Sequence, residues 1–114
     1  MSAKPLSKMA ALLCGGTAGI GLATAKHLAE RGVPKIMVVG RTHARGESAV
    51  DMLQRAATAT NFATPDIRFA AHDVTTASGA ADAVTEAITA FGQVDLLVNT
   101  GGGTGMPELF HQQE

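Results

Sequence analysis

The chain of 114 residues has no tryptophan and no tyrosine, and its only aromatic residues are four phenylalanines. Proteins that bind single-stranded nucleic acid stack bases on aromatic side chains, so that class is not expected here. Charged residues make up only 17% of the chain, and the net charge is −1 at pH 7. Because there is no basic excess, neither nucleic acid nor an anionic membrane is indicated as a partner.

Cysteine and long apolar runs are also scarce. The single cysteine, Cys14, excludes a disulfide within the chain and is typical of a protein in a reducing compartment. No stretch approaches the ~20 apolar residues of a membrane-spanning helix. The apolar run at 9–13, which follows Lys4 and Lys8, is shorter than the roughly 7–15 residues of a secretion-signal core. We therefore expect a cytoplasmic protein without a membrane partner.

The chain does have a regular alternation of two kinds of segment. Short segments that are typical of strands occupy 9–14, 35–39, 66–71 and 94–98; the first is a continuous apolar run without a polar face, as in a strand buried on both sides. Helical patterns lie between them at 19–31, at 46–57 and from a cap at Thr75 or Thr76 to about residue 91. In the first helix we expect Ile20, Ala23, Leu28 and the alanines between them to face inward. The last nine residues have no clear pattern.

This alternation predicts an α/β fold, a Rossmann-type parallel sheet with helices on both faces that ends after the fourth strand. The carboxyl ends of parallel strands meet at one edge, where ligands of open α/β sheets bind. The segments that follow the four predicted strands are 15–21, 40–45, 72–75 and 99–105. We expect the functional residues among them.

The segment after the first strand is rich in glycine. Residues 14–21 read Cys-Gly-Gly-Thr-Ala-Gly-Ile-Gly and lie between the strand and a helix, which is typical of a dinucleotide-binding turn. We expect a positive φ at Gly15, close approach of a pyrophosphate at Gly19 and close helix–strand packing at Gly21. Thr17 and Ala18 would form the tip. A turn that serves packing alone is the alternative hypothesis.

Arg41 is the residue that best distinguishes between cofactors. Sites for NAD place an acidic residue after the second strand, whereas an arginine suits the 2′-phosphate of NADP. No Asp or Glu lies between 36 and 45, and Arg41 and Thr42 stand there instead. We therefore expect NADP(H) to be preferred over NAD(H), with help from His43 and Arg45. A solvated surface arginine is the alternative. The missing acid also argues against an S-adenosylmethionine methyltransferase.

Three motifs in register resemble the N-terminal half of a short-chain dehydrogenase/reductase. The glycine turn matches Thr-Gly-x-x-x-Gly-Ile-Gly except for Cys14, which we interpret as a small apolar filler, with a redox role as the alternative. Asp73 and Val74 match the Asp-Val that ends the third strand. Residues 95–102 read Asp-Leu-Leu-Val-Asn-Thr-Gly-Gly, close to Asp-x-Leu-Val-Asn-Asn-Ala-Gly. The resemblance covers about 9–105.

The resemblance implies roles for these residues. Asp73 would accept the adenine amino group, with Val74 against the ring; a helix-starting acid without a ligand is the alternative for Asp73. Asn99 would lock the fourth strand, and Thr100 stands where the family has a second Asn. The expected cofactor-binding residues are Gly15, Thr17, Ala18, Gly19, Ile20, Gly21, Arg41, Thr42, Asp73, Val74, Asn99, Thr100 and Gly101.

The family's catalytic residues have no counterpart in this chain. The family uses a Tyr as acid and base, a Lys four residues later and a Ser that polarises the carbonyl. This chain has no Tyr, no Lys after Lys35 and, beyond Glu47, only Ser48 and Ser78, which lie in earlier elements. We expect no catalytic residue here. The four His lack the spacing of metal ligands, so no metal site is expected either.

Residues 1–114 are thus interpreted as the N-terminal part of a single NAD(P)-binding Rossmann domain. By resemblance, the complete protein would be an NADP(H)-dependent oxidoreductase that transfers hydride between nicotinamide and a small carbonyl or alcohol substrate, as a homodimer or homotetramer. The catalytic half would be absent, so we expect the isolated chain to be inactive. A non-catalytic dinucleotide-binding module, a redox sensor or scaffold half-domain, is the alternative hypothesis.

Overall fold

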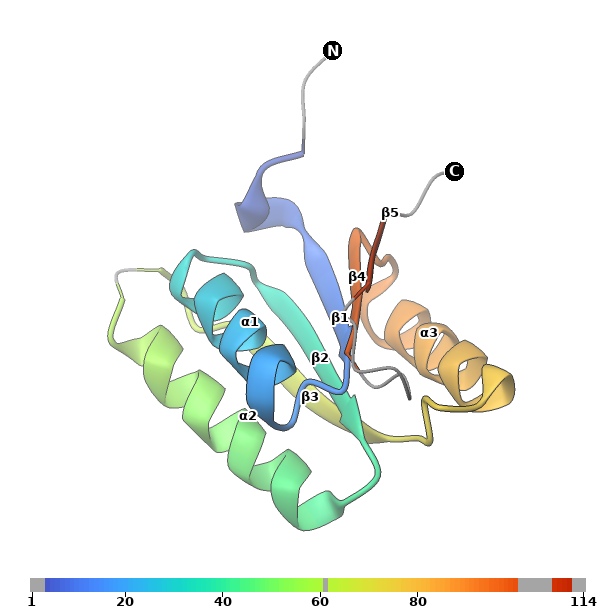
Figure 1. The fold of residues 1–114 in the computed structure, drawn as a ribbon. Coiled ribbons are helices and arrows are strands. Elements are labelled where there is room, and N and C mark those ends of the chain that lie inside the picture. Colours follow the sequence, from blue (N-terminus) through green and yellow to red (C-terminus); the bar gives the residue numbers. More distant parts are fainter. Residues whose placement is uncertain (1–3, 61, 101–107, 112–114) are drawn as a thin grey trace.

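The computed structural model describes residues 4–60, 62–100 and 108–111. Four parallel strands form the sheet: β1 (Ala10–Cys14), β2 (Lys35–Gly40), β3 (Asp66–Ala71) and β4 (Leu96–Asn99). The helices are α1 (Gly19–Glu30), α2 (His43–Thr58) and α3 (Ala77–Phe91), and a short 3₁₀ turn, η1 (Leu6–Lys8), precedes β1. Helices α1 and α2 cover one face of the sheet and α3 covers the other (Figure 1). The predicted Rossmann-type fold is confirmed.

The sheet continues past β4. Its strand order is β3-β2-β1-β4-β5, in which β5 (Glu108–His111) runs antiparallel to β4. The sequence indicated no strand in this region, because a four-residue strand is too short to establish an alternation of apolar and polar residues. The backbone groups on the outer edge of β4 therefore have a partner strand.

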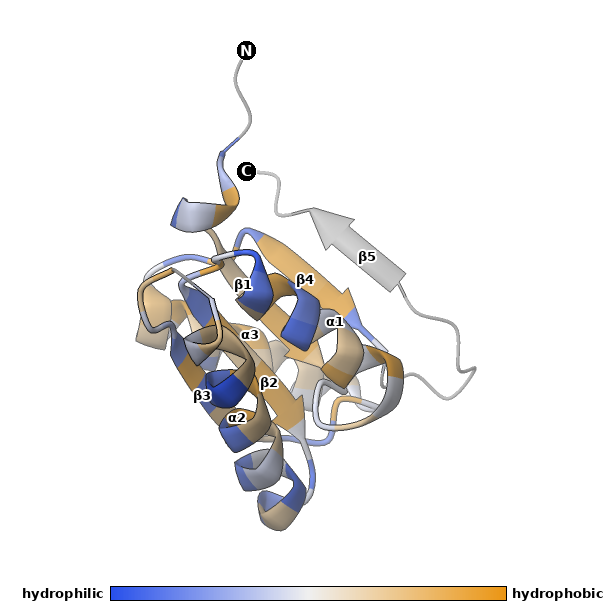
Figure 2. Cartoon of the chain, turned by 90° about the vertical axis from the view of Figure 1, so that its left-hand side faces the viewer, coloured by the Kyte–Doolittle hydropathy of each residue, from blue (hydrophilic) through white to orange (hydrophobic). Residues whose placement is uncertain are grey.

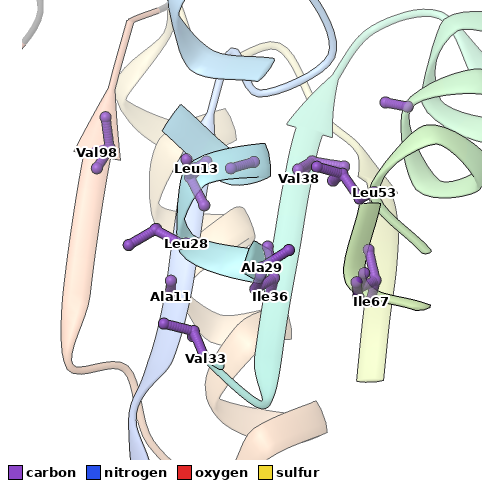
Figure 3. Close-up of a cluster of buried hydrophobic side chains, with 13 residues drawn as sticks. Ala11, Leu13, Leu28, Ala29, Val33, Ile36, Val38, Leu53, Ile67 and Val98 are labelled. Atoms are coloured by element: carbon purple, nitrogen blue, oxygen red, sulfur yellow. The ribbon is translucent and has the colours of Figure 1, made fainter. Parts of the chain in front are cut away.

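Apolar side chains from the strands form two cores, one on each face. Along β1, Ala11 and Leu13 point toward α1, whereas Leu12 and Cys14 point toward α3. Figure 3 shows the first core, where Leu28 of α1 packs over the strands. Figure 2 shows the apolar strands lying behind helices whose outer surfaces are more hydrophilic. Both faces of β1 and β2 are covered, which explains why these two strands lack a polar face, whereas β3 at the edge of the sheet exposes Asp66 and Arg68.

Three sequence expectations need correction. In α1 the buried residues are Gly21, Ala25, Leu28 and Ala29. Leu28 and Ala25 are thus buried as expected, but Ile20 is 63% exposed and Ala23 is also exposed, so these two residues do not belong to the inner face. The second helix begins at His43 rather than residue 46, and β4 covers 96–99 rather than 94–98. The helix start was missed because the exposed residues 43–45 precede its first buried position, Gly46.

Asp95 connects the starts of β1 and β4. Its carboxylate accepts hydrogen bonds from the Ala10 amide at 2.8 Å, from Gln93 Nε2 at 2.8 Å and from Lys4 Nζ at 2.6 Å. Partial burial raises the pKa of Asp95, but these donors outweigh it and hold the pKa below its ordinary value. This network lies at the amino ends of the strands, opposite the segments singled out above.

Candidate dinucleotide-binding site

The parallel topology brings the segments after all four strands to one edge of the sheet. The glycine turn follows β1, Arg41 and Thr42 follow β2, Asp73 and Val74 lie just beyond β3, and Asn99 ends β4 with Thr100 next to it. Gly101 lies outside the described residues. The candidate residues that the structure describes are therefore neighbours, although up to 85 residues separate those in hydrogen-bond contact.

Three glycines of the turn differ in what surrounds them. Gly15 has a φ of 89°, and its amide donates to the Val39 carbonyl at 2.8 Å. A Cβ at Gly21 would lie 2.3 Å from the Gly15 carbonyl oxygen. Gly19 has a φ of 57°, but a Cβ there would meet nothing within 4 Å. The first two glycines thus serve the turn and the helix packing, whereas Gly19 leaves open space at the edge.

The amino ends of α1 and α2 have no side-chain caps. Ala18 precedes α1 and Thr42 precedes α2, and neither makes a capping hydrogen bond; neither helix has an acid in its first turn. By contrast, Thr76 caps α3 by accepting a hydrogen bond from the Gly79 amide at 3.0 Å. Uncapped N–H groups and the helix dipole attract anions. This edge therefore suits the phosphates of a dinucleotide.

Thr17 joins the glycine turn to the end of β2. A Cβ at Gly40 would lie 2.9 Å from the Thr17 hydroxyl oxygen and 3.1 Å from its methyl carbon, so the Thr17 side chain packs on Gly40. Its neighbours Ala18 and Ile20 are exposed. The Ile20 side chain therefore does not pack in the core.

Thr100 joins the glycine turn to the end of β4. Its amide donates to the Cys14 carbonyl at 2.8 Å, and its hydroxyl lies 3.3 Å from the carbonyl oxygens of both Cys14 and Gly15. Asn99, which is half-buried, is paired with Cys14 in the β1–β4 ladder. The residue at the family's second Asn position thus contacts the backbone of the turn directly.

Asp73 begins the turn into α3. Its Oδ1 accepts hydrogen bonds from the Thr75 amide at 3.1 Å and from the Thr75 hydroxyl at 2.5 Å. These bonds lower the pKa of Asp73, and the positive charge of Arg41 lowers it further. Val74 is half-buried against the core under α3. Asp73 therefore makes the contacts of an acid that starts a helix, as the alternative hypothesis predicts. Its carboxylate also interacts electrostatically with Arg41.

Cys14 is buried, with 2% of its surface exposed. Burial raises the pKa of its thiol to about 11, so the thiol is protonated near neutral pH. It packs with Leu12, Met37 and Val39. A protonated, buried thiol behaves as a small apolar side chain, which favours the filler interpretation.

A groove of about 490 Å³ runs between α1 and α2 from the tip of the glycine turn. Of the expected cofactor-binding residues, Thr17, Ala18 and Gly19 line it. The other lining residues are Leu22, Ala44, Arg45, Ser48, Ala49 and Met52. Except for Arg45, sequence reasoning did not single these out. The spacing of 45, 48, 49 and 52 along α2 is that of one helical face and was the available signal.

Two further results concern the described residues as a whole. Within them, no three His, Cys, Asp or Glu side chains gather closely enough to hold a metal ion. None of the helices that could be searched combines the length and apolar character needed to cross a membrane.

Comparison with known proteins identifies the family. The sequence matches the short chain dehydrogenase family over residues 9–114. The chain belongs to this family. It is 36% identical over 98 residues to a probable 2,4-dienoyl-CoA reductase of Bacillus subtilis, covering 86% of this chain and 35% of the relative. It is 30% identical over 106 residues to (+)-neomenthol dehydrogenase of Capsicum annuum, covering 93% of this chain and 32% of the relative. The chain thus spans about a third of these relatives.

Solved structures of short chain dehydrogenases and reductases have the same arrangement. L-sorbose reductase of Gluconobacter frateurii, complexed with NADPH and L-sorbose, aligns with a TM-score of 0.70 at 29% identity, over 82% of this chain and 33% of that one. The C-domain of a bacterial malonyl-CoA reductase with NADP aligns with a TM-score of 0.72 at 29% identity, over 81% of this chain and 14% of that one. An NAD⁺-bound xylitol dehydrogenase aligns with a TM-score of 0.68 at 26% identity, over 82% of this chain and 33% of that one. Nicotinamide coenzymes of both kinds thus occur among the neighbours.

Proposed function

We propose that residues 1–114 form the coenzyme-binding part of an NADP(H)-dependent oxidoreductase. The complete protein would transfer hydride between the nicotinamide and a small carbonyl or alcohol substrate. Arg41 carries the choice of coenzyme: it follows β2 directly, where an acid would suit the ribose of NAD, and no acid lies between 36 and 45. An arginine fork matches a phosphate in shape and charge.

Three features of the edge support a 2′-phosphate beside Arg41. The first turn of α2 begins two residues later without a side-chain cap or an acid. Arg45 lines the groove together with Thr17 and Ala18 from the glycine turn. The positive charge of Arg41 lowers the pKa of Asp73, and we propose that this carboxylate binds the adenine amino group. Positive charge thus gathers on the α2 side of the edge.

The other expected residues would hold the rest of the coenzyme. The amide groups that open α1 would donate to the pyrophosphate, with Gly19 leaving room for it, and Ile20 and Val74 would give apolar contact. Asn99 and Thr100 would support the backbone on the nicotinamide side. The bound nicotinamide would supply the hydride. We assign no catalytic residue within 1–114, so the proton donor is not part of this proposal.

The test compares two arginine variants of the full-length protein. Calorimetry should show that Arg41→Ala weakens NADPH binding by about 10- to 100-fold, since a charge-assisted contact contributes ~1.5–3 kcal/mol, and leaves NADH binding unchanged. The matched control is Arg31→Ala. Arg31 is an exposed residue just after α1 at the opposite edge of the sheet, so its substitution should change neither NADPH binding nor NADH binding. Equal affinity of the unaltered protein for both coenzymes would contradict the assignment.

The remaining parts of the proposal concern the complete protein. Coenzyme-dependent turnover of ketones or alcohols would be followed by the absorbance of NADPH. We further propose a homodimer or homotetramer in a reducing, cytoplasmic setting, which the buried, protonated Cys14 suits. Size-exclusion chromatography with light scattering measures the oligomeric state.

A further inference from the structure

The first turn of α2 rests on one aromatic ring. Phe69 belongs to β3, where it is paired with Val38 of β2, and it packs at the border of the core under α1 and α2. A Cβ at Gly46 would lie 2.3, 2.4 and 2.5 Å from three atoms of the Phe69 ring. Real Cβ atoms keep at least 3.0 Å, so the helix and the ring can approach this closely only because residue 46 is a glycine.

The same ring has a second contact in this turn. His43 meets Phe69 edge-on, with ring centroids 5.5 Å apart and planes at 75°. The Gly46 amide donates to the Thr42 carbonyl at 3.0 Å, which closes the turn. Both the first residue of α2 and the residue that completes its first hydrogen bond therefore rest on Phe69.

Two arginines flank this supported turn. Arg41 lies two residues before His43, and Arg45 lies immediately before Gly46; both are exposed. At one end the segment is fixed by β2, where the Gly40 carbonyl accepts a hydrogen bond from the His72 amide at 3.0 Å. At the other end it is fixed by the contact with the Phe69 ring. A change in that contact would move the backbone that carries both guanidinium groups.

We propose that Phe69 is a positioning residue for coenzyme selection: packed against Gly46 and His43, its ring sets where Arg41 and Arg45 stand at the sheet edge. This inference rests on the proposed function, in which Arg41 binds the 2′-phosphate. Phosphate contacts depend on the placement of the donors, so a displaced turn weakens them. The adenine and pyrophosphate contacts come from other segments and are unaffected.

The test measures the ratio of the dissociation constants for NADPH and NADH in the full-length protein by calorimetry. Phe69→Leu removes the ring, and Gly46→Ala pushes the turn away from it. Each should weaken NADPH binding by about 3- to 10-fold, part of the loss expected for removing a charged contact, and change NADH binding less than about twofold. The double variant should bind NADPH better than Gly46→Ala alone, because the smaller leucine makes room for the new Cβ.

Two controls separate the possible causes. Val84→Ala shortens a partly buried side chain against the other core, under α3, and should lower stability without moving the ratio. Arg41→Ala tests the proposed function itself. If Arg41→Ala abolishes the preference but Phe69→Leu and Gly46→Ala keep it, the positioning inference is wrong and the proposed function stands. If Arg41→Ala leaves the ratio unchanged, both fail. Should Gly46→Ala not fold, Phe69→Leu decides, because it adds no atom.

Discussion

Two glycines of the same turn should respond to alanine in opposite ways. At Gly21 the new Cβ would lie 2.3 Å from the Gly15 carbonyl oxygen and 2.8 Å from the Thr100 hydroxyl. At Gly19 it would meet nothing within 4 Å, although the φ of 57° is unfavourable for a side chain. Gly21→Ala therefore disturbs the fold, whereas Gly19→Ala places a methyl group in the space proposed for the pyrophosphate.

The expected sizes follow from these distances. For Gly21→Ala, α1 and the turn must separate by about 0.7 Å to reach the 3.0 Å of real Cβ contacts, and overpacking of this kind costs ~1–3 kcal/mol of unfolding free energy. For Gly19→Ala the left-handed backbone costs ~1–2 kcal/mol. Blocking one charge-assisted contact to phosphate costs another ~1.5–3 kcal/mol in binding, a 10- to 100-fold loss of coenzyme affinity.

Gly92 supplies a matched control for the backbone effect. It has a φ of 81°, a Cβ there would also meet nothing within 4 Å, and it follows α3 at the opposite edge of the sheet. Gly92→Ala and Gly19→Ala should therefore lose similar stability in urea unfolding, but only Gly19→Ala should lose affinity for NADPH in calorimetry. Unchanged affinity in Gly19→Ala would refute the proposed pyrophosphate position. A Gly21→Ala variant of full stability would refute the packing argument.

Three further outcomes are expected from other contacts. Asp95→Asn should cost ~1–2 kcal/mol at pH 7 in urea unfolding. Because the folded pKa of Asp95 is depressed below the 3.8 of a free carboxyl, its contribution is present above that pH and lost as the pH falls through the folded pKa; an equal cost at pH 7 and in strong acid would contradict this. Thr100→Val should weaken NADPH and NADH binding by the same factor, measured by calorimetry, and Thr100→Ser should restore both; a loss confined to one coenzyme would be inconsistent with a contact to the turn. Cys14 in the folded protein should resist alkylation at pH 8, as followed by mass spectrometry, and rapid labelling would contradict a buried thiol with a pKa of about 11.

The sequence was sufficient to predict the four parallel strands of the sheet but not β5 or the contacts between segments. Continuous apolar runs identify buried strands because both faces of a parallel sheet are covered, and the strand order places their ends at one edge. In α1 the burial of Ala25 and Leu28 was expected, but Ile20 was wrongly placed on the inner face because it is the larger residue, whereas its neighbour Gly21 meets the sheet. Hydrophobicity predicts burial correctly where large apolar side chains fill the core. It predicts the wrong residues where a helix packs on the sheet through small residues.

The same limit explains why Phe69 was overlooked. A phenylalanine in a strand is an ordinary core residue by its pattern, and a glycine in a helix looks like a weak point. Their complementarity depends on a contact between residues 23 positions apart, at the crossing of α2 and β3. Local periodicity carries no information on such a pair.

The edge of the sheet is built from side chains that enter the space left by glycines on the neighbouring segment. Thr17 packs on Gly40, and Phe69 packs under Gly46. These contacts run from the turn after β1 to the end of β2, and from β3 to the start of α2. Each glycine thereby sets how closely two neighbouring segments approach.

Thr100 continues this row on the β4 side, where its hydroxyl occupies the space beside Gly21. Gly19 differs from Gly21, Gly40 and Gly46, because no atom fills the space beside it. From the sequence we expected helix–strand packing at Gly21 and close approach of a pyrophosphate at Gly19. The distances show that Gly21 packs against neighbouring segments, whereas Gly19 has open space beside it. Gly19 is therefore the position where the backbone would meet a bound phosphate. A substitution at Gly19 is the one that separates the effect on coenzyme binding from the effect on folding.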